Sequence, residues 1–219
     1  MSVNNYVLTT RQRLMNFLGI TTVTTTEGNV LDRIINSVTD YIEHYCQRRF
    51  KQTTYTNEEY DGTGSKQLLL KNYPVSTTAT FTLGERQTSL HSDDWDNVDS
   101  SLYFVQYNEG IVELPRGKDW RALTSTGESE FNALIRGWRV TYTAGYNYDN
   151  TVTFLSDVGL SDLEYIAWRL CAIGWNRRKG DPGVESERIG DYSVSYAKEV
   201  FENSEVKAIL DKYARMDVV

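Results

Sequence analysis

The sequence predicts an α+β fold in which long amphipathic helices pack with a small antiparallel β region, followed by an extended C-terminal arm and helix. Two observations carry this prediction. Apolar residues recur at three- and four-residue steps in two long segments, residues 27–50 and 161–179, as they do on one face of an α-helix. Between these segments, short runs of β-branched and aromatic residues are separated by turn residues, which is typical of β-strands.

The first 26 residues are expected to form a short helix and a loop. Thr9 and Thr10 are candidate N-caps for a helix that runs to about Leu18, where Gly19 ends it. Residues 21–26 are interpreted as a loop or a short extended stretch.

The helix over residues 27–50 is predicted from an apolar stripe opposed by a polar face. The stripe consists of Val30, Leu31, Ile34, Ile35, Val38, Tyr41, Ile42 and Tyr45. The polar face is predicted to carry Asp32, Arg33, Asn36, Asp40 and Glu43. Arg48 and Arg49 follow at the C-terminal end, where the helix dipole favours cations.

The β-rich region is predicted over residues 51–150. Candidate strands cover residues 54–60, 67–70, 79–83, 102–107, 111–114 and 133–142. Asn108-Glu109-Gly110 separates two of these strands and indicates a tight hairpin. The polar stretches 84–101 and 117–130 are interpreted as surface insertions.

The second long helix is predicted over residues 161–179. Ser161 and Glu164 have the spacing of a capping box at its start, and Gly180 is placed to cap its end. Residues 189–196 are then interpreted as a short strand or an extended arm, and residues 204–215 as a final helix.

The predicted organisation has three parts: an N-terminal segment (1–26), a core (27–180) and a C-terminal arm with its helix (181–219). The composition suits a globular protein with a hydrophobic core, because 40% of the 219 residues are hydrophobic and 24% are charged. The 15 tyrosines indicate either an assembly surface or a tyrosine-rich sheet.

Charge and cysteine usage exclude several classes of protein. The net charge of −7 argues against a dedicated nucleic-acid binder, which gathers Lys and Arg on one face. Two cysteines, Cys46 and Cys171, make no disulfide framework and favour a reducing compartment. We recognise neither a signal peptide nor an apolar run of membrane-spanning length, so no membrane partner is expected.

The motifs that could carry chemistry are weak. Asp61-Gly62-Thr63-Gly64-Ser65-Lys66 resembles a phosphate loop, but its Gly-Lys spacing is wrong and a strand is predicted to follow, so a turn is favoured. Asp93, Asp94, Asp96 and Asp99 lack the Gly and Glu of a calcium loop, so a solvated acidic loop is favoured over a calcium site.

The two histidines do not suggest a site. His44 and His91 stand at no metal-ligand spacing with each other or with a cysteine, and no zinc-protease or nucleophile-elbow motif occurs. We therefore expect no catalytic residue, no metal and no cofactor, and a protein that is not an enzyme. An enzyme with a dispersed active site is the alternative from another class.

Basic and aromatic clusters near the two long helices have ordinary interpretations. The basic residues Arg48, Arg49 and Lys51 end the first long helix, and residues 177–179 end the second; both clusters are interpreted as cations that complement a helix dipole and are solvated there. The functional alternative is a ring of cations that faces an acidic partner or DNA. Trp168, Trp175 and Tyr165 are interpreted as core rather than interface, and both cysteines as small buried hydrophobes.

Several segments, in a fixed order, resemble the head–tail connector (adaptor, or head-completion) proteins of tailed bacteriophages. The resemblance covers residues 28–82 and 132–197. It rests on the helix that contains Leu31-Asp32-Arg33-Ile34-Ile35 and Tyr45-Cys46-Gln47-Arg48-Arg49-Phe50, on Tyr60-Asp61-Gly62 and Tyr73-Pro74-Val75, on Arg139-Val140-Thr141-Tyr142-Thr143-Ala144-Gly145-Tyr146, and on Ser186-Glu187-Arg188-Ile189-Gly190-Asp191-Tyr192.

The resemblance implies a structural virion protein located in the neck and assembled in the host cytoplasm. Connector proteins of this family form a homo-oligomeric ring, usually a dodecamer, beneath the portal protein. Such a ring extends the channel for double-stranded DNA without sequence-specific binding, and it joins the head to the next neck or tail protein. A head-closure or tail-completion neck protein is the alternative within the virion.

The segment after the second long helix is where we expect partners to bind. Extended segments can add to a sheet of a neighbouring molecule, and amphipathic helices can lie in a groove. The residues predicted for this interface are Arg188, Asp191, Tyr192, Tyr196, Phe201, Ile209 and Tyr213.

Overall fold

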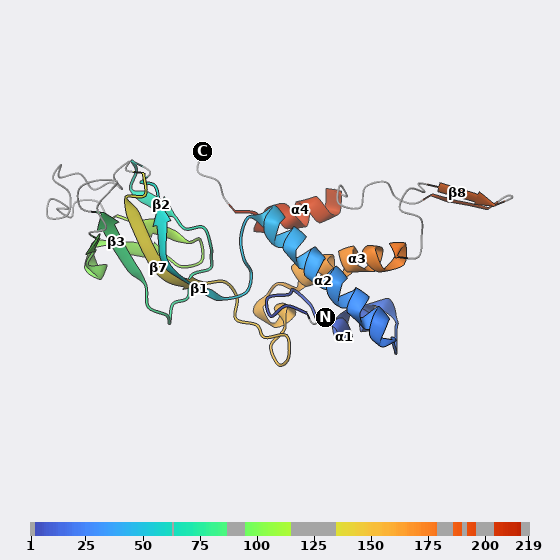
Figure 1. Cartoon of the computed structure of the whole chain (residues 1–219). Coiled ribbons are helices and arrows are strands. Elements are labelled where there is room, and N and C mark those ends of the chain that lie inside the picture. The colour runs from blue at the N-terminus through green and yellow to red at the C-terminus, as the bar shows by residue number, and fades with distance from the viewer. Residues whose placement is uncertain are drawn as a thin grey trace. The chain divides into compact units, whose positions relative to one another are not determined.

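The computed structural model describes residues 3–62, 64–86, 95–114, 135–178 and 204–215, and the backbone of residues 186–189 and 192–195. The chain divides into two compact units (Figure 1). The helical unit is built from Met1–Phe50 and Asn147–Arg215, and the β unit from Lys51–Tyr146. The helices and antiparallel sheets confirm the predicted α+β class. The three-part division at residues 26 and 180 stays a prediction.

The helical unit contains α1 (Arg11–Leu18), α2 (Thr25–Cys46), α3 (Ser161–Arg177) and α4 (Ser204–Tyr213). A 3-10 turn at Leu155–Val158 precedes α3, which packs against each of the other helices. α2 and α3 approach closely at Gly174, where an added Cβ would lie 3.2 Å from Cγ2 of Ile34. No helix in the described ranges is both long and apolar enough to cross a bilayer.

Side-chain caps start the first two helices. Thr10 accepts a backbone N–H of the first turn of α1 at 3.2 Å, and Gly19 ends that helix with a φ of 68°, as predicted. α2 begins earlier than predicted because Thr24 and Glu27 form a capping box, in which each side chain bonds the other residue's backbone N–H. The last two residues of the predicted loop 21–26 are therefore helical.

The end of α2 differs from the prediction. The helix stops at Cys46, short of the expected end at residue 50, because Gln47 adopts a positive φ of 53°. The chain then folds back, and the guanidinium of Arg48 lies 5.2 Å from the ring centroid of Phe50. Arg48 is buried, so the interpretation of this cation as a solvated partner of the helix dipole is wrong.

The capping box predicted at the start of α3 is also wrong. Leu160 occupies the N-cap position, and no side chain caps the helix there. Glu164 is 1% exposed and pairs with Arg13 of α1, because a buried carboxylate requires a charged or hydrogen-bonding partner. Gly180, the predicted C-cap, lies outside the described residues.

The β unit contains two antiparallel sheets. The first has the order β1-β7-β3-β4, with bounds Thr53–Tyr60, Trp138–Ala144, Thr82–Arg86 and Trp95–Asn97. The second has the order β2-β6-β5, with bounds Gln67–Leu69, Ile111–Glu113 and Phe104–Gln106. Every second side chain of β7 is buried, so one face of the first sheet covers the core. The core consists of residues of the β unit itself, among them Leu68, Leu83, Val112 and Val140.

The strand predictions are least accurate in the first sheet. β3 and β7 are both displaced toward the C-terminus from the predicted ranges 79–83 and 133–142. The hairpin at Asn108-Glu109-Gly110 is confirmed by the antiparallel pairing of β5 with β6. Residues 117–130, interpreted as an insertion, lie outside the described part of the chain.

β4 lies within the stretch 84–101 that the sequence suggested was a loop. The indole ring of Trp95 lies between two guanidinium groups, those of Arg86 and Arg139, at 4.7 and 4.8 Å from its centroid. Cation–π contacts of this kind stabilise a strand that its own polar sequence does not predict. Residues 84–86 and 95–97 of this stretch therefore belong to paired strands of the first sheet, in which Glu85 stands opposite Asp96.

The two ends of the β unit meet. Lys51 forms a bridge with Tyr146, the N–H of Gln52 donates to the carbonyl of Tyr146 at 3.0 Å, and Thr53 stands opposite Ala144. The β unit is thus an insertion between two halves of the helical unit, and the chain enters and leaves it at one place.

Beyond α3, β8 (Ser186–Ile189) and β9 (Tyr192–Ser195) pair as an antiparallel hairpin. The short strand predicted within residues 189–196 is present as β9, but the prediction did not include its partner strand β8. Ile189 pairs with Tyr192, which leaves only Gly190 and Asp191 between the strands. Two intervening residues that include a glycine are a sequence signal typical of a β-hairpin.

Candidate assembly surface

α4 lies against α2 and α3 and buries one apolar face there (Figure 1). Val206, Leu210 and Tyr213 are 2%, 0% and 7% exposed. The ring of Tyr213 meets that of Phe50 edge-on, with centroids 6.0 Å apart, and the thiol of Cys46 approaches the carbonyl of Leu210 at 3.7 Å. We call the surface that receives α4 the α4 seat; it is formed by Tyr45, Cys46, Phe50, Asp162 and Arg169.

Charged groups mark both ends of the α4 seat. Arg169 pairs with Glu205 in the first turn of α4 at 2.5 Å, and Asp162 pairs with Lys212 in its last turn at 2.8 Å. Asp162 also accepts a hydrogen bond from the hydroxyl of Tyr213 at 2.5 Å. Burial alone would raise the pKa of Asp162, but the hydrogen bonds from Lys212 and Tyr213 outweigh it and lower that pKa.

Two further contacts fasten the C-terminal end of α4. The hydroxyl of Tyr45 donates to Asp211 at 2.6 Å, and this hydrogen bond raises the pKa of Tyr45 to about 12. The backbone N–H of Arg215 donates to the carbonyl of Cys46 at 2.9 Å. The carbonyl of Cys46 lies in the last turn of α2, where carbonyl groups have no hydrogen-bond partner within their own helix.

α1 is held by two ion pairs with buried carboxylates. Arg11 makes a two-point contact with Asp32, which is fully buried on α2. Gly28 leaves room for this contact, since a Cβ there would lie 3.0 Å from Nη1 of Arg11. Arg13 reaches Glu164 on α3 at 2.7 Å. The pKa of Arg11 is raised by its hydrogen bonds to Asp32.

These ion pairs were not predicted, because Asp32 was assigned to the polar face of the helix. The sequence nevertheless contains an indication that Asp32 is buried. Asp32 follows Gly28 by four residues and adjoins Leu31, so it lies at the border of the apolar stripe, with a residue that has no side chain one turn before it.

A further polar cluster surrounds the buried carboxylate of Glu43, near the end of the first half of the helical unit. Oε1 of Glu43 accepts the N–H of Phe50 at 3.2 Å, and Arg49 lies 3.9 Å from its other oxygen. Burial raises the pKa of Glu43, while Phe50 and Arg49 act in the opposite direction and Asp40 adds to the rise. Arg49 also lies over the ring of Tyr6, at 5.1 Å from its centroid.

Aromatic residues of α3 divide between core and surface. Trp175 is buried, as predicted, and the guanidinium of Arg178 lies 3.4 Å from its ring centroid. Tyr165 is 44% exposed, so its interpretation as core is wrong. Tyr165 and the half-exposed Phe17 of α1 meet edge-on at 6.1 Å, and Trp168 stacks beside Phe17 at 5.5 Å.

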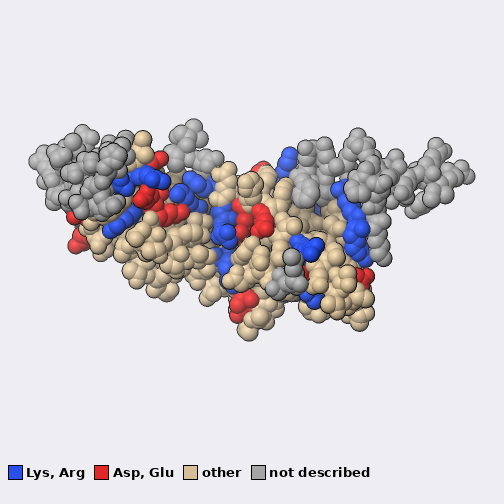
Figure 2. Space-filling model, in the orientation of Figure 1, with Lys and Arg blue, Asp and Glu red and all other residues tan. Residues whose placement is uncertain are grey.

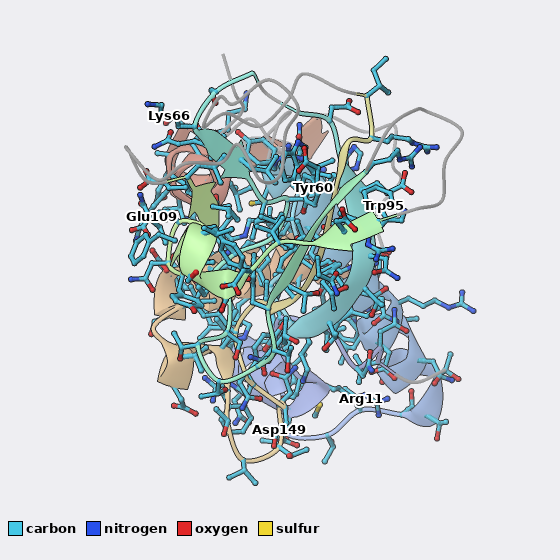
Figure 3. All side chains as sticks on the ribbon, turned by 90° about the vertical axis from the view of Figure 1, so that its left-hand side faces the viewer. Arg11, Tyr60, Lys66, Trp95, Glu109 and Asp149 are labelled. Atoms are coloured by element: carbon cyan, nitrogen blue, oxygen red, sulfur yellow. The ribbon has the colours of Figure 1, made fainter. Side chains whose placement is uncertain are left out.

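A tyrosine network lies inside the β unit, where Figure 3 labels Tyr60. The hydroxyls of Tyr60 and Tyr142 are 2.9 Å apart, and both donate to Glu58, which also lies 3.6 Å from the ammonium of Lys71. Burial raises the pKa of both tyrosines. Tyr55 stacks on Tyr142 at 5.2 Å, so these tyrosines belong to the sheet and its core rather than to an outer surface.

The weak motifs form no site among the described residues. Gln67–Leu69 after the glycine-rich stretch is a strand, as predicted, so the phosphate-loop reading fails; Lys66 lies at the edge of the β unit (Figure 3). Asp99 caps a 3-10 turn through the N–H of Ser101, whereas Asp93, Asp94 and His91 lie outside the described residues. The described part holds no cluster of metal-ligating side chains.

The remaining titratable groups that sequence analysis singled out are accounted for by packing. Cys46 and Cys171 are buried free thiols, and burial raises the pKa of each to about 12, so neither is an activated nucleophile. His44 is exposed on α2. On the face drawn in Figure 2, described Lys and Arg lie in separate patches with Asp and Glu beside several of them.

The residues predicted for a partner interface fall into three groups. Side chains are described for Ile209, which is half-buried, and Tyr213, which is buried in the α4 seat. Arg188 and Tyr192 lie on β8 and β9, of which only the backbone is described. Asp191, Tyr196 and Phe201 lie outside the described residues. The structure thus brings Tyr213 onto the chain's own helices, and the partner interface stays a prediction.

The fold of this chain is similar to that of solved structures, although its sequence has no match among family models or curated proteins. A chain in the virion of a native gene transfer agent (GTA) particle aligns over 100% of this chain and 95% of its own length, with 13% identity and a TM-score of 0.51. It therefore shares the fold of this protein.

Two further solved structures align with the chain. One is the neck of an empty GTA particle computed with C6 symmetry (TM-score 0.48, 13% identity, 95% of this chain and 90% of that one). The other is the neck of a native GTA particle computed with C12 symmetry (TM-score 0.46, 12% identity, 100% of this chain and 94% of that one).

Proposed function

We propose that this protein is a structural component of the neck of a tailed phage-like particle, in which copies of the chain form a ring beneath the portal. The observation that carries the proposal is the fold shared over the whole chain with a chain of the GTA virion. The ordered segments that resemble head–tail connectors support it independently, because they were recognised from residues alone.

The finer features of the role belong to the same proposal. The ring contains twelve copies, is assembled in the host cytoplasm, and binds the portal on one side and the next neck or tail protein on the other. Double-stranded DNA passes through it without sequence-specific contacts. A net charge of −7 suits a channel through which phosphates slide rather than bind.

The interior of the protein is consistent with a structural role. Three buried acids have fixed partners within the fold: Asp32 with Arg11, Glu164 with Arg13, and Glu43 with the backbone of Phe50. These groups fasten helices to one another. Nothing in their arrangement offers a base beside a nucleophile, which an enzyme of the dispersed kind would require.

Cryo-electron microscopy of heads tests the proposal. Purified protein is added to heads that carry the portal but lack this protein, with heads lacking the portal as the control. We expect a ring directly beneath the portal and no density on portal-free heads. A ring one layer lower would instead assign a head-closure or tail-completion role. Absence of a ring from portal-bearing heads would overturn the proposal.

A further inference from the structure

We propose that, in the assembled ring, the α4 seat of each subunit receives the α4 helix of a neighbouring copy, so that α4 is exchanged between subunits. This inference rests on the ring proposed above. Two observations support the exchange. α4 is held in the seat by apolar contacts and by an ion pair at each end, and a long connection separates it from α3.

The connection allows the exchange. α3 ends at Arg177 and α4 begins at Ser204, and the β8–β9 hairpin occupies residues 186–195 between them. Residues 179–185 and 196–203 remain, fifteen in all. Fifteen extended residues span at most about 50 Å, which exceeds the width of a small domain. The connection therefore allows α4 to occupy the seat of an adjacent copy wherever that seat lies within this reach.

The contacts that hold α4 do not depend on which chain supplies it. Val206, Leu210 and Tyr213 fill the apolar part of the seat. Arg169 binds the acidic start of α4 through Glu205, and Asp162 binds its basic end through Lys212. The same residues would meet in the same way after exchange. Because the two charge pairs have opposite polarity, α4 fits the seat in only one direction.

Exchange of this kind produces the geometry that a ring requires. Each subunit donates its α4 to the next subunit, which donates its own α4 to a third, so every contact is head-to-tail. Head-to-tail contacts close into a ring when the rotation between neighbouring subunits divides a full turn. An isolated chain fills its own seat, as seen here, so the apolar part of the seat is covered. Exchange replaces these contacts with identical ones, so its free-energy cost is small once neighbours are held close together.

Zero-length cross-linking of a mixed ring tests the exchange. Equal amounts of nitrogen-15-labelled and unlabelled full-length protein are unfolded together, refolded and assembled on portal-bearing heads. A carbodiimide then joins carboxylates to amines in direct contact, and mass spectrometry reads the isotopes of each cross-linked pair. Lys212 and Asp162, at 2.8 Å, report on α4. Lys71 and Glu58, 3.6 Å apart within the β unit, are the internal control, since both come from one chain.

Exchange predicts that about half of the Lys212–Asp162 cross-links combine one labelled and one unlabelled peptide, whereas all Lys71–Glu58 cross-links are uniform. If rings form and the Lys212–Asp162 cross-links are uniform as well, the exchange is refuted and the ring proposal stands. If wild-type protein forms no ring on portal-bearing heads, the ring proposal falls, and the exchange falls with it.

Charge reversal gives a second test that does not depend on chemical cross-linking. A seat variant carries Asp162→Lys with Arg169→Glu, and a helix variant carries Glu205→Arg with Lys212→Asp. Alone, each places like charges at both ends of α4, and we expect about tenfold fewer rings. Mixed one to one, the two variants restore opposite charges at every contact between alternating subunits, so exchange predicts recovery.

The chain that carries all four substitutions is the matched control, since it restores the charges whether or not α4 is exchanged. Thermal unfolding of each variant reports whether α4 still docks in the isolated chain. If the four-substitution chain forms rings and the mixture does not, then each α4 remains on its own subunit and the exchange is refuted.

Discussion

Glu164 of α3 lies 2.7 Å from Arg13 of α1, and its carboxylate is almost fully shielded from solvent. The guanidinium of Arg13 also lies over the rings of Phe154 and Trp168, at 4.4 and 5.4 Å from their centroids. The pair therefore joins the N-terminal helix to residues more than a hundred positions later in the chain. This pair fastens α1 to α3 within the helical unit.

Arg13→Ala should destabilise the helical unit by about 3 kcal/mol, because it leaves the buried Glu164 without its cation. Urea unfolding followed by circular dichroism measures the change. Gln12→Ala, at an exposed position of the same helix, is the control and should change the free energy of unfolding by less than about 0.5 kcal/mol. Glu164→Gln in the Arg13→Ala background should recover part of the loss. Equal effects of Arg13→Ala and Gln12→Ala would show that the pair is not what holds α1.

The sequence allowed the helices to be predicted because their stripes and breakers are local. Thr10 caps the start of α1 and Gly19 ends it, and α2 has an apolar stripe. Each of these signals depends on residues within a few turns of one another. The start of α3 at Ser161 was predicted correctly, but the cap proposed for it was wrong. Ser161 and Glu164 have the spacing of a cap, yet Glu164 is taken by Arg13, which is distant in sequence.

The same reasoning explains the errors in the sheet and in the candidate site. β4 is a strand because Trp95 is stacked between Arg86 and Arg139, which come from two other strands. α4 was predicted as a helix with the correct apolar face, but its docking onto Asp162 and Arg169 is a tertiary contact with no local signal. An apolar stripe shows that a helix is covered, not which surface covers it.

Gly174→Ala should change stability very little in the wild-type chain. Alanine gains about 1 kcal/mol over glycine inside a helix, but its Cβ would lie 3.2 Å from Ile34, so crowding offsets the gain. In an Ile34→Ala background the crowding is absent, and the same substitution should stabilise by about 1 kcal/mol. A double-mutant cycle by chemical denaturation measures both effects. Equal values in the two backgrounds would mean that α2 and α3 can separate slightly at no cost.

Glu43→Gln should improve stability increasingly as the pH rises. Burial raises the pKa of Glu43 in the folded protein above its unfolded value. The favourable contribution of the protonated group is therefore complete below about pH 4 and is lost as the pH rises through the folded pKa. Glutamine stays neutral and still accepts the N–H of Phe50, so it avoids that loss.

Urea titrations between pH 4 and pH 7 measure this difference. The free energy of unfolding of Glu43→Gln minus that of the wild type should grow with pH. Glu109→Gln removes a carboxylate at the exposed turn between β5 and β6 and serves as the control for the loss of a surface charge. A difference for Glu43→Gln that shrinks with pH would mean that Arg49 and Phe50, not burial, dominate the ionisation of Glu43.

The β unit, residues 51–146, should fold when produced alone. Its core is drawn entirely from its own strands and loops, and its ends are already joined by Gln52, Thr53, Ala144 and Tyr146. A fragment whose ends pair with each other loses little when the flanking chain is removed, because the entry and exit points need no outside support. We expect a cooperative urea transition and dispersed amide signals in a nuclear magnetic resonance spectrum. The fragment 57–146, which lacks the paired start of β1, is the matched control and should be markedly less stable. If both fragments behave alike, then the pairing of the ends does not define the unit.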